Sequence, residues 1–89
     1  MLIPINRDIK LNYGQLTRIL KILGYKNTGK IDASLIYEHA KSKSVIVLRH
    51  TRKNEVVREI IAAGVLRSIV YSNVASEKKV KVLAEKISS

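Results

Sequence analysis

The sequence predicts an α+β domain in which one helix precedes two or three antiparallel strands and two further helices follow them. Its 89 residues suffice for a single domain covering the whole chain. Apolar residues recur at helical spacing in three segments, and β-branched residues gather between the first and second of these. Strands that are grouped together and flanked by helices indicate an α+β fold rather than alternating βαβ units.

Residues 12–23 carry the clearest helical pattern. Four apolar side chains at i, i+3, i+4 and i+7 share one face, and they are Leu16, Ile19, Leu20 and Leu23. Asn12 is a suitable N-cap, and Gly24 suits the position just after the C-terminus. We expect residues 1–11 to form an extended lead-in to this helix.

Two strands are expected in mid-chain, over residues 33–40 and 44–49, joined by a short polar turn into a hairpin. A third strand near residues 25–30 completes an antiparallel sheet. The second hairpin strand is apolar on both faces, because valines alternate with Ile46 and Leu48. We therefore expect its far face to be covered, either by a partner or by another layer of the same domain.

Two helices are predicted after the strands. The first runs from about residue 55 to residue 71, with Asn54 as its cap. Gly64 lies in its middle, where glycine costs about 1 kcal/mol relative to alanine. We therefore expect the helix to pack closely against another backbone at Gly64. The second helix covers residues 76–88 and is capped by Ser76.

Composition narrows the classes of partner. Lys and Arg number 17 against 7 Asp and Glu, which gives a net charge of +10 and favours nucleic acid or an acidic protein as partner. The absence of cysteine excludes disulfides and thiolate metal sites, and two histidines are too few for a histidine-rich metal site. No apolar run is long enough to span a membrane, and no signal peptide is evident. We expect a cytoplasmic protein with no metal or cofactor.

The densest cationic stretch runs from residue 41 to residue 53 and contains no acidic residue. Six of its side chains are expected to contact phosphate and sugar: Lys41, Lys43, Arg49, His50, Arg52 and Lys53. The turn before the second hairpin strand and the loop after it lie roughly 20 Å apart, a span that suits a phosphate backbone better than one small anion. Arg67 is a further candidate for RNA contact, or alternatively a surface arginine that packs its stem.

Three residues are candidates for catalysis, namely Ser34, His39 and His50. Ser34 and His39 lie five residues apart on one predicted strand, so their side chains point to opposite faces and cannot act as a pair. We expect His39 to be a half-buried strand residue. His50 stands between cationic neighbours and is expected to contact phosphate rather than to act as a general base.

Several segments occur in an order that resembles a known family. They are LTRILKILGY (16–25), IYEH (36–39), VIVL (45–48) and LRSIV (66–70). Together they resemble the HicA-type toxins, also called YcfA-like proteins, and the resemblance covers about residues 12–88. It implies a fold like that of double-stranded-RNA-binding domains, with an extra C-terminal helix as in the family's longer members. It also implies an mRNA-cleaving toxin that a HicB-type antitoxin neutralises.

The family's Gly-Ser-His signature is absent from this chain. Asp32, Ala33 and Ser34 stand at its three positions, so a serine replaces the histidine that the family uses in catalysis. A serine hydroxyl cannot replace imidazole as general acid or base near neutral pH. The resemblance therefore implies an RNA-binding HicA-like domain of a toxin–antitoxin system, whose ability to cleave RNA is in doubt.

Two alternatives stay open. A protein-interaction or homodimerisation module that binds an acidic partner, such as a HicB-like antitoxin, would cover the two-faced strand and balance the charge. An active, metal-independent mRNA endoribonuclease would instead recruit His39 or His50 in place of the missing histidine.

Overall fold

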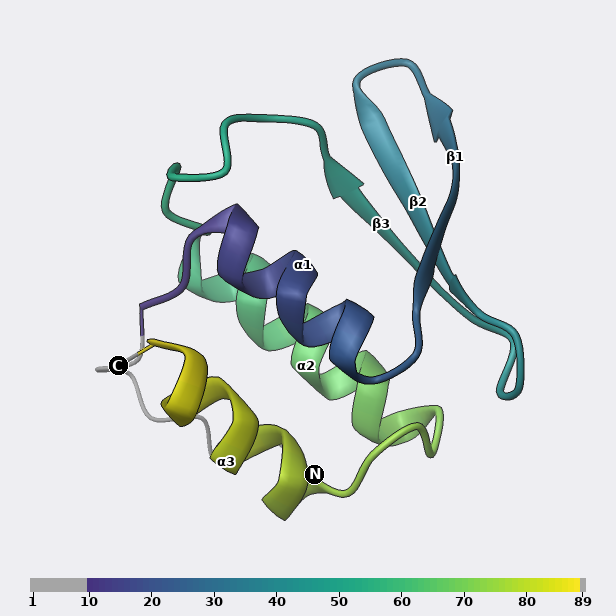
Figure 1. The fold of residues 1–89 in the computed structure, drawn as a ribbon, viewed down its shortest axis with the longest axis vertical. Helices are drawn as coiled ribbons and strands as arrows, with labels where there is room; N and C mark the ends of the chain where they lie inside the picture. Colours follow the sequence, from purple (N-terminus) through teal and green to yellow (C-terminus); the bar gives the residue numbers. More distant parts are fainter. Residues whose placement is uncertain (1–9, 89) are drawn as a thin grey trace.

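Six elements follow one another in the computed structural model, which describes residues 10–88 (Figure 1). They are α1 (Tyr13–Ile22), β1 (Lys26–Ile31), β2 (Ser34–His39), β3 (Ser44–Arg49), α2 (Glu59–Tyr71) and α3 (Glu77–Ser88). The predicted α+β order is confirmed, including the third strand and the last helix. Residues 1–9 of the predicted lead-in lie outside the described part. No helix within residues 10–88 is long and apolar enough to cross a membrane.

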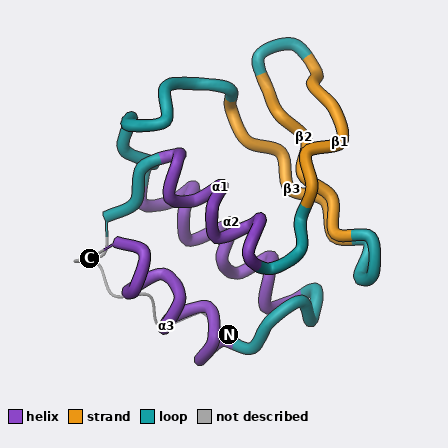
Figure 2. The backbone as a smooth tube through the Cα atoms, viewed as in Figure 1, coloured by secondary structure: helices purple, strands orange, loops and turns teal. Residues whose placement is uncertain are grey.

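The strands form one antiparallel sheet in the order β1-β2-β3. α1 and α2 pack beside the sheet, and α3 lies on the far side of these two helices (Figures 1 and 2). Both connections within the sheet are short, since Ile31 pairs with Ser34 and His39 pairs with Ser44. The longest connection follows β3 and leads around α1 to α2 (Figure 2).

α1 forms where its sequence predicts it. The side chain of Asn12 accepts a hydrogen bond from the Gln15 backbone at 2.7 Å, and the Gln15 side chain accepts one from the Asn12 backbone at 2.8 Å, which completes a capping box. The helix ends before Gly24, whose φ of +99° is favourable only for glycine. The predicted apolar face is buried as expected.

The core lies between the sheet and the two helices α1 and α2, and it continues between these helices and α3. Its fully buried side chains are Tyr25, Leu16, Ile19, Leu20, Leu66, Ile69 and Val80. β3 contributes Ile46 and Leu48 to this core, whereas Val45 and Val47 point the other way and are 53% and 57% exposed. No described residue forms a layer over that outer face, so the expectation of a second internal layer is wrong. Cover by a partner remains a prediction.

The predicted start of α2 at Glu55 is wrong. Val56 and the next residue are β-branched valines that favour extended backbone, and Val56 pairs with Asn12 in an isolated antiparallel bridge. Asn54 therefore caps no helix. Arg58 occupies the N-cap of α2, and its side chain makes no capping hydrogen bond. α3, by contrast, begins with the predicted cap: the hydroxyl of Ser76 accepts a hydrogen bond from a backbone N–H of its first turn at 3.1 Å.

Two glycines should respond oppositely to alanine. Gly64 is exposed, and a Cβ built there meets none of the described atoms within 4 Å, so the expected close approach of another backbone is wrong. We expect Gly64→Ala to raise the free energy of unfolding by about 0.5–1 kcal/mol. A Cβ at Gly24 would lie 3.1 Å from Nε2 of His39, and φ is positive. Gly24→Ala should lower stability by about 1–2 kcal/mol. Urea unfolding of both variants measures these changes. If the two substitutions changed the free energy of unfolding in the same direction, one of the predictions would be wrong.

Tyr25 should make the domain sensitive to alkali. Its hydroxyl lies 2.7 Å from the hydroxyl of Ser44 in a buried hydrogen bond. Burial raises the pKa of Tyr25, and the bond to Ser44 offsets part of this rise. In the unfolded chain the Tyr25 phenol ionises near pH 10. Its neutral form therefore contributes fully to the free energy of unfolding below pH 10, and this contribution is lost as the pH rises through the raised pKa of the folded state.

Tyr25→Phe should therefore reduce the decline in unfolding free energy measured by urea titration between pH 9 and pH 11. The variant should also lose about 1 kcal/mol at pH 7, because the buried hydrogen bond disappears. Ser44→Ala is the matched control. It removes the same bond but leaves the buried phenol, so it should keep the alkaline decline. An undiminished decline in the phenylalanine variant would show that another group is responsible.

Candidate nucleic-acid interface

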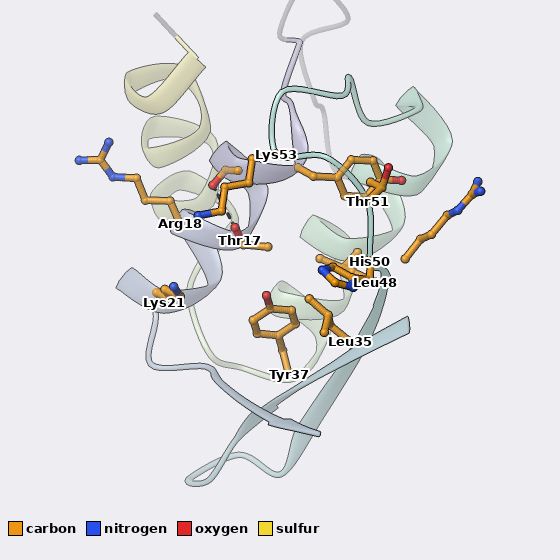
Figure 3. Close-up of a pocket in the computed structure, with 12 residues that line it drawn as sticks. Thr17, Arg18, Lys21, Leu35, Tyr37, Leu48, His50, Thr51 and Lys53 are labelled. Atoms are coloured by element: carbon orange, nitrogen blue, oxygen red, sulfur yellow. Dashed lines mark hydrogen bonds between the residues drawn. The ribbon is translucent and has the colours of Figure 1, made fainter. Parts of the chain in front are cut away.

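A pocket of about 280 Å³ opens between α1, the helix-facing side of the sheet and the loop that follows β3 (Figure 3). Among the described residues that line it, five are basic and none is acidic; the basic ones are Arg18, Lys21, Arg49, His50 and Lys53. Glu55 belongs to the same loop but does not line the pocket, and its carboxylate accepts a hydrogen bond from Thr51 at 2.9 Å. We call this hollow the basic pocket.

α1 supplies one wall of the basic pocket. Thr17 and Lys21 lie one turn apart on the same face of the helix. The Thr17 hydroxyl donates a hydrogen bond to the Gly14 carbonyl oxygen at 3.0 Å, which fixes the rotamer of Thr17. Figure 3 shows Thr17 beside the opening, whereas the guanidinium of Arg18 extends away from it. Lys21 is thus the cation that α1 adds on this side.

The loop after β3 supplies the opposite wall, and α1 holds it in place. The backbone N–H of Gly14 donates to the Lys53 carbonyl at 2.9 Å, and that of Tyr13 donates to the Glu55 carbonyl at 3.0 Å. A Cβ at Gly14 would lie 3.3 Å from both the carbonyl oxygen and the Cβ of Lys53. Glycine therefore permits this close approach, and the Lys53 side chain lies beside α1 in Figure 3.

His50 enters the pocket from the end of β3. Its backbone N–H donates to the Ala33 carbonyl at 2.6 Å and continues the sheet one residue beyond the strand. The imidazole lies beside Leu35 and Leu48, which with Tyr37 form the apolar floor (Figure 3). The hydroxyl of Tyr37 is directed into the opening in the same view. The pocket thus combines cations, an imidazole and a phenol over an apolar base.

The first turn of α1 is not available to an anion. Its first three N–H groups donate to the Glu55 carbonyl, the Lys53 carbonyl and the Asn12 side chain. Anion binding at a helix N-terminus requires unpaired N–H groups, so a phosphate in this region must be held by side chains. A second hollow of about 280 Å³ shares Gly14, Arg18 and Lys53 with the basic pocket and extends the cationic surface over the helix start.

The fold divides the predicted cationic cluster. His50 and Lys53 line the basic pocket. Arg49 borders it, but its side chain alternates with that of Leu48 and so belongs to the outer face of the sheet. Arg52 is exposed on the same loop without lining the pocket.

Lys41 and Lys43 occupy the turn before β3, at the other end of that strand from the basic pocket. Arg67 is half-buried on α2 and does not line the pocket. Its Nε is buried without a hydrogen-bond partner, an arrangement typical of an arginine that packs its stem against the protein surface.

The catalytic candidates are separated as well. Ser34 pairs with Arg49 at one end of β2, and His39 pairs with Ser44 at the other end, on the opposite face. His39 is half-buried, as expected; Nδ1 accepts a hydrogen bond from the Ser42 backbone at 3.2 Å. Neither Ser34 nor His39 lines the basic pocket, so His50 is the one catalytic candidate found there.

Sequence reasoning missed Thr17, Lys21 and Tyr37 as pocket residues. Lys21 was visible only as a polar residue off the buried face of the first helix. Its position one turn after Thr17 marks the flank that faces the pocket, but nothing local says that this flank meets a loop more than 30 positions later. Among residues 10–88, no group of three or more His, Cys, Asp and Glu side chains is placed to hold a metal ion.

Comparisons with protein-family models, with curated proteins and with solved structures give no significant match to this chain.

Proposed function

We propose that this chain is a cytoplasmic RNA-binding domain that holds the sugar-phosphate backbone in the basic pocket. One observation carries the proposal: segments distant in the sequence place Lys21, His50 and Lys53 around one hollow that no acidic side chain of residues 10–88 lines. Cations gathered in this way neutralise phosphates and release counterions, which supplies most of the affinity for nucleic acid. The resemblance to HicA-type toxins implies the same ligand, within a toxin–antitoxin system.

Recognition should follow shape and charge rather than base identity. Three of the four tyrosines are buried, and Tyr71 is the exposed one, on α2 away from the basic pocket. Single-strand platforms require exposed aromatic rings on which bases stack. An A-form duplex, by contrast, is recognised through phosphates and 2′-hydroxyls. We therefore favour duplex RNA as the ligand.

Fluorescence anisotropy with a labelled RNA duplex tests the proposal. Binding should be measurable at 50 mM salt, and log affinity should fall linearly with log salt, by about 0.9 for each phosphate neutralised. A DNA duplex of the same sequence should bind more weakly because it lacks the 2′-hydroxyls. Failure to bind the RNA duplex at 50 mM salt would contradict the proposal.

RNA cleavage is the second candidate function, and the position of His50 in the basic pocket supports it. The imidazole of His50 lines the pocket into which the Tyr37 hydroxyl is directed. If cleavage occurs with EDTA present, His50→Ala should reduce its rate by about 10²–10⁴-fold, as expected for loss of general acid–base catalysis. His39→Ala should leave the rate unchanged. Intact RNA after prolonged incubation with the unmodified protein would reject cleavage and leave RNA binding standing.

A further inference from the structure

α1 and α3 are neighbours on the side of α1 that faces away from the sheet (Figure 1), and a further hollow is lined by residues of these two helices. Its volume is about 400 Å³. Its apolar residues are Ile22, Val82 and Leu83, and the remaining lining residues are Lys78, Lys79 and Lys86. None of the described residues that line it is acidic, although α3 contains Glu77 and Glu85. We call it the α1–α3 groove.

The groove is a fixed part of the fold. Val80 and Ala84 are almost completely buried, and they anchor α3 on the core. Near the other end of the groove, the side-chain amide of Gln15 donates to the Ile87 carbonyl at 3.1 Å and ties α1 to α3. Leu83 also packs against the core, whereas Ile22 and Val82 are more than half exposed.

The lining residues of α3 form a second face of that helix. Lys79, Val82, Leu83 and Lys86 recur at i, i+3, i+4 and i+7, so an apolar pair is flanked by lysines. Val82 is 55% exposed, and Ile22 is 54% exposed. Two exposed apolar side chains thus lie in one furrow with a cationic rim, instead of being scattered over the surface.

We propose that the α1–α3 groove binds an amphipathic helix of a partner protein, whose apolar stripe is flanked by carboxylates. A furrow between two packed helices accepts a third helix that inserts residues at i, i+3 or i+4, and i+7. Charge complementarity selects an acidic partner, because a carboxylate on that partner would compensate Lys78 and Lys79 when water is excluded from the groove. This inference rests on a different surface from the proposed RNA contacts.

The same charges argue against two other occupants. A second copy of this chain carries a net charge of +10 and would bring like charges together. A flat lipid surface touches protruding residues, whereas the apolar floor here lies in a furrow shared by two helices. Both remain distinguishable outcomes of the experiment.

The probe is a synthetic 18-residue peptide with leucines at helical spacing and glutamates on both flanks. Titrated into the isotopically labelled full chain, it should shift the NMR signals of Ile22, Val82 and Leu83. The variant Ile22→Ser/Val82→Ser, which keeps every charge, should weaken binding at least tenfold. Val45→Ser/Val47→Ser is the matched control on the outer face of the sheet, and it should bind normally.

Two comparisons separate this site from general attraction to a cationic protein. A peptide of the same composition with its leucines off the helical period should bind at least tenfold more weakly. Lys79→Glu/Lys86→Glu should abolish binding of the amphipathic peptide, whereas Lys41→Glu/Lys43→Glu should not.

Three results would overturn the inference: equal binding of both peptides, shifts confined to the basic pocket, or unchanged affinity in Ile22→Ser/Val82→Ser. Vesicles of phosphatidylglycerol that bind the chain but not this variant would assign the groove to lipid, and loss of a dimer in the variant would assign it to a second copy. RNA affinity should stay within twofold in the variant, so the two proposals fail separately.

Discussion

Replacing Lys21 and Lys53 by glutamine should weaken binding to an RNA duplex roughly 25- to 60-fold near 0.1 M salt. These two residues supply the ammonium groups that α1 and the loop after β3 bring to the basic pocket. Each phosphate contact contributes about 0.7–0.9 to the slope of log affinity against log salt, so the slope should fall by about 1.4–1.8. Glutamine keeps most of each apolar stem, and the urea midpoint of the variant should stay close to that of the parent.

A variant with the same loss of charge provides the control. Lys41→Gln/Lys43→Gln also removes two positive charges, but from the turn at the other end of β3. The slope of log affinity against log salt for this variant should change by less than the contribution of one phosphate contact, about 0.7–0.9. If both pairs weaken binding equally, RNA is attracted by the total charge of the chain and the basic pocket is not its site. If Lys41→Gln/Lys43→Gln weakened RNA binding more than the pocket variant does, the RNA site would lie at the hairpin turn instead.

Local patterns predicted the elements whose stabilising contacts are themselves local. The helical period and the capping box of Asn12 define α1, and a run of consecutive β-branched residues defines β3. The predicted start of α2 was wrong because Asn54 and Glu55, taken alone, have the sequence features of a helix N-terminus. The backbone after Asn54 pairs instead with the segment that precedes α1, and this contact spans more than 40 positions of the chain. A pattern read over a dozen consecutive residues cannot reveal such a long-range contact.

The candidate site shows the same limit. The run from residue 41 to residue 53 is continuous in sequence, yet a six-residue strand divides it, so its lysines lie at opposite ends of β3. Strand alternation also turns Arg49 away from His50. The cation that completes the pocket, Lys21, comes from the first helix, because tertiary packing rather than sequence spacing sets which flank of α1 faces the loop. The dense run of cations therefore indicated an anionic ligand, but it identified only part of the surface that forms the basic pocket.

Ile69→Ala should lower the free energy of unfolding by about 2–5 kcal/mol, the largest effect on stability that we expect from one substitution. Ile69 has no exposed surface and lies on the face of α2 that enters the core. Alanine removes buried methyl and methylene groups and leaves a cavity that close-packed neighbours fill only in part. A domain of this size is stable by roughly 5–13 kcal/mol, so the melting temperature should fall by about 10 °C or more.

Ile60→Ala makes the same chemical change on the same helix, which isolates the effect of burial. Ile60 is 75% exposed, so its truncation should change stability by about 0.5 kcal/mol or less, and the better helix propensity of alanine offsets part of any loss. Urea unfolding of both variants therefore measures which face of α2 meets the core. Equal losses would mean that α2 is rotated or detached from its place beside the sheet. The sheet and α1 are packed on that core and form two walls of the basic pocket, so the geometry proposed for RNA binding would fail with it.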